Sequence, residues 1–180
     1  MGVEPKLLSV GMHGQMVHPK KVVQPADLPV RQSHSQVVTV TGGTLLFVAG
    51  MTSRSEKDAS PVHPGDMRAQ LRQVCQNIGR ALRSVGADFS DVVKTTTFTT
   101  DVEEYHRVSD ERFKYFTRDL PTSALIGVKR LSHPDLMVEI EAMAVIPAGR
   151  ASSARGARPP ATQPRRVAVP KAARASARRR

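Results

Sequence analysis

The sequence predicts an α+β fold, with a mixed six-stranded sheet and two helices on one of its faces. Residues 137–146 alternate at the two-residue period of a strand, and residues 67–85 carry apolar side chains at helical spacings of three and four. Segments rich in β-branched residues precede and follow the predicted helices. This order of strands and helices is typical of an α+β domain, whose uncovered sheet face meets water or another subunit.

Charge is distributed unevenly along the chain. Of its 180 residues, 39% are hydrophobic and 4% aromatic, so aliphatic side chains must fill the core. From Pro147 onward there are ten Lys or Arg residues and no Asp or Glu, and removing these ten from the total of 27 leaves 17 basic against 16 acidic residues. We therefore expect a flexible arm over residues 1–20, a nearly neutral domain over 21–147 and a disordered basic tail over 148–180.

The basic tail has two interpretations. It could contact RNA, DNA or an acidic surface weakly through counterion release, or it could be a tolerated extension without a partner. The absence of stacking aromatic residues favours the second interpretation. The sequence also lacks an apolar run of membrane-spanning length and the sustained apolar core of a signal peptide, so we expect a cytoplasmic protein.

The first predicted elements are strands. Residues 21–24 are expected to form a short edge strand, followed by longer strands over 36–41 and 44–49. The pair Gly42-Gly43 between the longer strands predicts a two-residue hairpin, because both turn positions need positive φ. Gly50 ends the last of these strands, at a point where the backbone could approach a ligand closely.

The main helix follows. Asp66 suits its N-terminus and Gly86 its C-terminus. Cys75 lies on the apolar side and is interpreted as a small buried hydrophobic residue rather than a nucleophile; as the only cysteine it excludes an internal disulfide and multi-cysteine metal sites. The predicted buried face comprises Met67, Leu71, Val74, Ile78, Leu82 and Val85.

The remaining predicted elements are a strand, a helix and two further strands, in that order. Residues 91–100 are dense in β-branched side chains and predict a strand, and Asp101 with Glu104 resembles a capping box at the start of a second helix. Residues 122–128 and 137–146 predict the last two strands. The buried face of the second helix is expected to comprise Val102, Tyr105, Val108, Phe113 and Phe116.

The two faces of the last strand differ in character. One face is apolar and predicts core: Val138, Ile140, Ala142, Ala144 and Ile146. The other face mixes carboxylates with apolar side chains: Met137, Glu139, Glu141, Met143 and Val145. This mixture suggests a face covered by another subunit, and the alternative is an ordinary half-exposed face with Glu141 in water.

Four dispersed motifs together resemble the RidA (YjgF) family of enamine/imine deaminases. They are residues 46–50, 91–98, 121–125 and 138–142, and the similarity spans residues 22–147. The resemblance implies a chorismate-mutase-like fold and a homotrimer with a barrel-like centre and a pocket at each subunit interface. It also implies metabolite damage control: active members hydrolyse the enamines and imines released by pyridoxal-phosphate enzymes to 2-oxo acids and ammonia, without metal or cofactor.

The resemblance also implies site residues. Glu139 matches the family's carboxylate, which would orient or activate water, although it could instead be a structural carboxylate at the trimer interface. Ser123 stands where deaminase-active members carry an arginine that clamps the substrate carboxylate. Because a serine cannot replace that charged fork, the resemblance implies a non-standard substrate. Lys129 or Arg130 could supply the missing cation, but at most one of these neighbours can point to the pocket.

Other positions of the implied pocket are also altered. His34 replaces a loop tyrosine and Ser109 a helix asparagine, while Gly50 and Ala124 complete the substrate-binding set. His34 could act as an acid or base, hold an anion when protonated, or simply form hydrogen bonds.

His106 and His133 are expected at the surface, and the spacing of the six histidines predicts no metal site. The predicted function is therefore hydrolytic deamination of a small enamine or imine to a carbonyl compound and ammonia. The alternative is a non-catalytic trimer that binds a metabolite or a partner.

Overall fold

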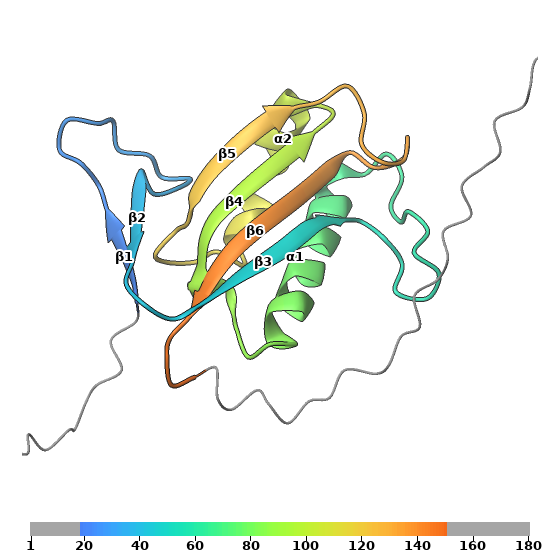
Figure 1. Cartoon of the computed structure of the whole chain (residues 1–180). Helices are drawn as coiled ribbons and strands as arrows, with labels where there is room; N and C mark the ends of the chain where they lie inside the picture. Colours follow the sequence, from blue (N-terminus) through green and yellow to red (C-terminus); the bar gives the residue numbers. More distant parts are fainter. Residues whose placement is uncertain (1–18, 151–180) are drawn as a thin grey trace, which may run out of the picture.

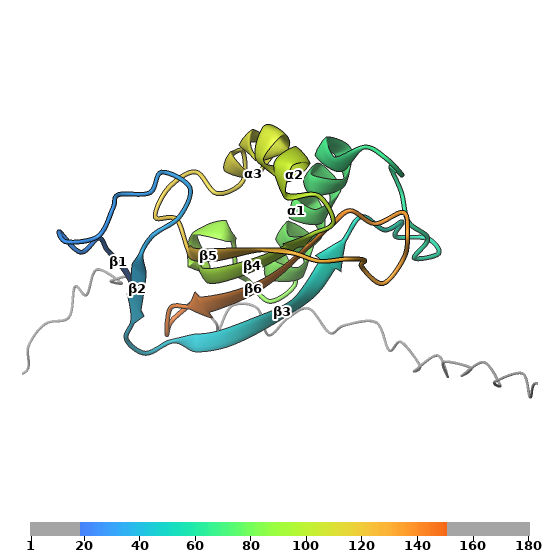
Figure 2. The same cartoon turned by 90° about the horizontal axis from the view of Figure 1, so that it is seen from above.

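The computed structural model describes residues 19–150 and contains one mixed four-stranded sheet with helices on one face (Figures 1 and 2). The strand order is β3-β6-β4-β5. Strand β6 pairs antiparallel with β3 and β4, and β4 pairs parallel with β5. The bounds are β3 Thr44–Thr52, β4 Val92–Thr99, β5 Thr122–Gly127 and β6 Val138–Ile146. The predicted α+β class and mixed sheet are confirmed.

The first two strands form a separate small sheet, so the predicted hairpin around Gly42-Gly43 is wrong. Strand β1 (Lys20–Val23) pairs antiparallel with β2 (Val37–Val40), while β3 pairs with β6. Both glycines have positive φ, but they form a corner between the two sheets. A Cβ on Gly43 would lie 2.6 Å from the carbonyl oxygen of Ile146, so this corner needs glycine to pass the end of β6. The six strands therefore divide into sheets of four and two.

The main helix, α1 (Met67–Arg83), forms as predicted. The Asp66 carboxylate accepts a hydrogen bond from the Ala69 amide, and Gly86 has a φ of 77° beyond the helix end. The predicted face is buried through Leu82, but Val85 lies past the helix and is 39% exposed. Cys75 is fully buried, and burial raises the pKa of its thiol to about 12, which confirms a packing role.

The second helical segment is broken in two. Helix α2 (Val102–Val108) begins at Asp101, whose carboxylate accepts a hydrogen bond from the Glu104 amide at 2.8 Å. A separate short helix, α3 (Asp110–Phe113), follows Ser109. Figure 2 shows α1, α2 and α3 together on one side of the sheet. A short 3-10 helix, η1 (Phe89–Asp91), precedes β4.

The predicted core face of β6 is buried, which confirms that part of the alternation. The opposite sheet face carries none of the described helices and faces the viewer in Figure 1. On it Phe47 is 75% exposed and Glu141 is exposed, and a shallow depression of about 370 Å³ is lined by residues that include Phe47, Lys94 and Met143. We refer to this surface as the open face.

The expected arm and tail lie mostly outside the described residues. Strand β1 begins at Lys20, whose ammonium group donates hydrogen bonds to the carbonyl oxygens of Asp119 and, at 2.6 Å, of Val92. At the other end, Arg150 forms ion pairs with Asp91 and, at 3.7 Å, with Asp88. Within residues 19–150 no helix is long and apolar enough to cross a membrane.

Candidate functional site

A cavity of about 280 Å³ lies on the helix side of the sheet, next to edge strand β5. Three of the predicted site residues, His34, Ser109 and Ser123, line it. They come from the β1–β2 loop, the junction between α2 and α3, and β5. The full lining is Arg31, Ser33, His34, Thr97, Tyr105, His106, Ser109, Arg112, Phe113, Ser123 and Leu125. We refer to this cavity as the helix-side pocket.

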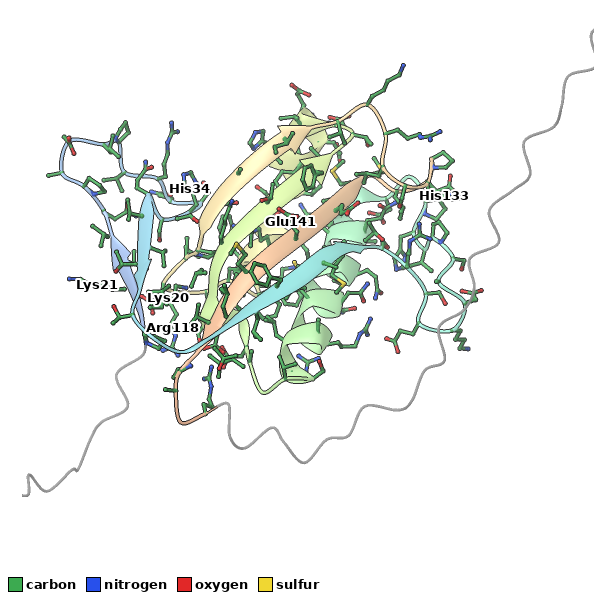
Figure 3. All side chains as sticks on the ribbon, viewed as in Figure 1. Lys20, Lys21, His34, Arg118, His133 and Glu141 are labelled. Atoms are coloured by element: carbon green, nitrogen blue, oxygen red, sulfur yellow. The ribbon has the colours of Figure 1, made fainter. Side chains whose placement is uncertain are left out.

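The loop that carries His34 is fastened on both sides of the histidine. The Ser35 amide donates to the Pro121 carbonyl at 3.1 Å, and the Ser35 hydroxyl donates to the Leu120 carbonyl. Arg112 Nη1 donates to the Ser33 carbonyl at 3.1 Å. His34 is therefore held beside the start of β5, as Figure 3 shows. Its Nδ1 lies 3.0 Å from the Ser33 hydroxyl oxygen.

Ser123 is linked to a buried arginine that the sequence did not reveal as a site residue. Its hydroxyl oxygen accepts a hydrogen bond from Thr95 Oγ1 at 3.0 Å, and Thr95 Oγ1 accepts one from Arg112 Nη2 at 3.2 Å. Arg112 is only 4% exposed. The sequence did contain one indication that Arg112 is buried. This residue lies four residues after Val108 and four before Phe116, on the apolar stripe of the predicted helix.

The helix-side pocket is basic. Its ionisable lining includes the arginines Arg31 and Arg112 and the histidines His34 and His106, and none of its lining residues is Asp or Glu. Burial raises the pKa of the Tyr105 phenol, so this group remains a hydrogen-bond donor at neutral pH. Such a lining favours a small anionic ligand over a cationic one.

Glu139 and Gly50 meet each other on the open face, away from the helix-side pocket. A Cβ on Gly50 would lie 1.8 Å from Glu139 Oε1, so the carboxylate rests directly on the Gly50 backbone. The close approach expected at Gly50 is thus made by Glu139. The register of β3 against β6 shifts between Val48 and Met51, which brackets this contact.

The other candidates are distributed between the two faces. Ala124 follows Ser123 on β5, and neighbouring strand residues point to opposite faces. Ala124 therefore lies on the open face, where it is exposed. Arg130 shares a shallow depression with Glu139 and Phe98, whereas Lys129 does not line it. The predicted pocket residues therefore form two groups in a single chain.

Of the two histidines expected at the surface, His106 is exposed and His133 is half-buried, and their surroundings differ. His106 lines the rim of the helix-side pocket. His133 Nδ1 lies 3.7 Å from a carboxylate oxygen of Asp135. Figure 3 shows His133 at the opposite end of the molecule from His34, which lines that pocket. Among residues 19–150, no three His, Cys, Asp or Glu side chains are grouped so that they could hold a metal ion.

The fold and pocket define a small α+β protein with a cavity of the size of a small metabolite. The sequence profile of the family described as Endoribonuclease L-PSP matches residues 25–146, and the chain belongs to this family, the RidA (YjgF) family. A RutC family protein of Synechocystis sp. is 30% identical over 129 residues, which cover 71% of this chain and 97% of that protein.

Two further relatives support the assignment. The protein named 2-iminobutanoate/2-iminopropanoate deaminase in Rattus norvegicus is 31% identical over 127 residues, covering 70% of this chain and 90% of that protein. The solved structure of YyfB from Yersinia pestis, a Rid family protein of unknown function, superposes with a TM-score of 0.66 at 27% identity, covering 71% of this chain and 99% of that one. The family resemblance stated above is confirmed.

Proposed function

We propose that this protein is a cytoplasmic enzyme that hydrolyses a small enamine or imine to a carbonyl compound and ammonia, without metal or cofactor. The observation that carries this proposal is the small cavity at which His34, Ser109 and Ser123 meet, in a chain of the RidA family. Its volume suits a metabolite of a few carbon atoms. The relatives named as imine deaminases support the same chemistry.

The proposed active form is a homotrimer in which each pocket is completed by a neighbouring copy. In one chain Glu139 lies on the open face, while His34 and Ser123 line the helix-side pocket. The open face carries large exposed apolar side chains, including Leu45 and Phe47, which a second copy would remove from water. Glu139 of a neighbouring copy would then reach the pocket, and the joined sheets would form the barrel-like centre.

The proposed reaction consists of addition followed by elimination. An enamine first becomes an imine by transfer of a proton from its nitrogen to its β-carbon. Water then adds to the carbon of the C=N bond, Glu139 takes a proton from this water, and His34 gives a proton to the nitrogen. In the resulting carbinolamine, Glu139 returns its proton to the amino group and the hydroxyl gives its proton to His34. The C–N bond breaks with its electron pair on nitrogen, so ammonia leaves and a carbonyl group forms.

A second candidate function is favoured by Ser123, which lacks the charge of the arginine usual at this position. In this function the trimer binds a metabolite or a partner without converting it. The two candidates differ in turnover, and both predict ligand binding.

Product release from imines generated in situ separates the two candidates. The compounds to test are 2-aminoacrylate and a panel of bulkier and uncharged imines. We expect the protein to hydrolyse at least one of them faster than it hydrolyses spontaneously. Glu139→Gln should lower this rate by about 100-fold or more, because it removes the group that accepts the proton of water. Glu141→Gln removes an exposed carboxylate from the same face of β6 and serves as the control. Catalysis of none of these imines would contradict the deaminase proposal.

A further inference from the structure

The side chain of Arg112 is a buried cation for which residues 19–150 provide no carboxylate partner. Its neighbour Glu111 shows the contrast: that carboxylate is 2% exposed and is paired with Arg72 at 2.9 Å and with Lys114 at 2.6 Å. Burying an uncompensated charge is strongly unfavourable unless hydrogen bonds or an opposite charge offset it. Burial accordingly lowers the pKa of Arg112, although an arginine remains charged at neutral pH.

The guanidinium group is fixed in place but not saturated. Nη1 donates to the Ser33 carbonyl and Nη2 to Thr95 Oγ1, and the group lies 4.5 Å from the centre of the Phe116 ring. Nε is buried and has no hydrogen-bond acceptor among the described residues. An arginine carries more N–H groups than these two bonds use, and its planar fork matches the two oxygens of a carboxylate.

The cavity beside Arg112 supplies what an anion needs. The remaining ionisable lining includes Arg31, His34 and His106, so no acidic group competes for the guanidinium there. The Ser123 hydroxyl oxygen already accepts a hydrogen bond from Thr95, which leaves its own proton available to a ligand. Phe113 and Leu125 offer an apolar wall for the rest of the molecule.

We propose that Arg112 is the anion-binding residue of the helix-side pocket, and that the ligand carries a carboxylate there. Arg112 on α3 thus supplies the positive charge of the pocket, and no arginine is needed at the position of Ser123 on β5. The candidate Arg130 lies on the opposite sheet face, next to Glu139. This assignment rests on the proposed function for the identity of the substrate, which becomes an imine or enamine bearing a carboxylate. Binding of the anion itself does not depend on turnover.

Calorimetric titration of the full-length protein tests this assignment without catalysis. The probes are 2-oxobutanoate, which has no C=N bond to hydrolyse, and its uncharged amide. The variants are Arg112→Gln, Arg112→Lys and the control Arg107→Gln, whose exposed side chain pairs with Glu104 on α2. Arg112→Gln should weaken 2-oxobutanoate binding by about 10- to 100-fold and leave amide binding unchanged, because a charge-assisted contact is lost. Arg112→Lys keeps the charge and loses the planar fork, so its affinity for 2-oxobutanoate should lie between those of the wild type and Arg112→Gln.

Three results would overturn the assignment: no binding of 2-oxobutanoate to the wild type at millimolar concentrations, equal binding of acid and amide, or wild-type affinity in Arg112→Gln. If Arg112→Gln does not fold, a crystal structure of the wild type with 2-oxobutanoate decides, since the carboxylate must contact the Arg112 guanidinium. Carboxylate binding without imine turnover would contradict the proposed function alone. Turnover that is unaffected in Arg112→Gln would contradict the role of Arg112 alone.

Discussion

At the scale of single residues, the contact between Gly50 and Glu139 sets the position of the proposed catalytic carboxylate. Because Glu139 Oε1 occupies the space that a side chain at position 50 would need, Gly50→Ala must displace the carboxylate. We expect Gly50→Ala to destabilise the fold by about 1–3 kcal/mol and to lower turnover.

A double-mutant cycle in urea isolates this contact. In a Glu139→Ala background the added methyl group meets no carboxylate. Gly50→Ala should therefore lower the free energy of unfolding clearly less in that background than in the wild type. Equal costs in both backgrounds would show that Glu139 does not rest on Gly50. Gly127→Ala, at a residue with ordinary φ at the end of β5, provides the comparison for an added methyl group elsewhere in the sheet.

The ion pairs of Glu111 predict a pH dependence of stability. The hydrogen bond from Arg72, and then that from Lys114, lower the pKa of this carboxyl group below its usual range. The stabilisation is therefore present above the unfolded-state pKa and is lost as pH falls through the folded-state value.

Urea unfolding of Glu111→Gln at about pH 7 and about pH 3 measures this effect. The variant should be less stable than the wild type at neutral pH, by no more than about 1 kcal/mol because both cations are largely exposed, and the difference should shrink at acid pH. A difference that grows on acidification would contradict the sign. Glu103→Gln, on the exposed side of α2, is the control.

At the scale of elements, Gln70 joins α1 to the segment that leads into β6. Its amide nitrogen donates to the carbonyl oxygens of His63 and Asp135, and its amide oxygen accepts from the Met137 amide at 2.8 Å. The side chain is fully buried, so Gln70→Ala leaves these backbone groups without partners. We expect a loss of about 2–4 kcal/mol in the free energy of unfolding, against little change for the exposed Gln76→Ala. Similar stabilities of the two variants would contradict this role.

The elements that the sequence predicted well are those whose pattern is local. Helix α1 and strand β6 carry periodic apolar residues, and their buried faces follow from that period. The hairpin at Gly42-Gly43 failed because positive φ identifies a turn but not the strands that pair beyond it. That pairing depends on the approach of Gly43 to Ile146, a contact between residues far apart in sequence.

The candidate site was predictable to a similar extent. The family resemblance identified His34, Ser109 and Ser123, which line one pocket, but it could not show that Glu139 lies on the opposite face of the same chain. Arg112 was missed because the family resemblance implied no pocket role for its position. Only the fold brings its guanidinium next to Thr95 and, through it, to Ser123.

At the scale of the whole molecule, the open face predicts self-association. Phe47 is among the most exposed large apolar side chains of the described residues, and it lies on the proposed subunit interface. We expect a trimer by analytical ultracentrifugation, and dissociation on Phe47→Asp because a buried, unpaired carboxylate opposes assembly. Val30→Asp, at an exposed position in the β1–β2 loop, is the matched control. A wild type that stays monomeric at micromolar concentrations would contradict the trimer.

The central claim, an imine-hydrolysing site shared between copies, is tested most directly by turnover in hybrid trimers. Co-expression of differently tagged Glu139→Gln and Arg112→Gln chains yields mixed trimers in which one interface combines an intact Arg112 with an intact Glu139. Each variant alone should be nearly inactive on the best imine substrate, and the purified hybrids should recover about a third of the wild-type rate. No recovery in hybrids shown to contain both chains would contradict the shared site.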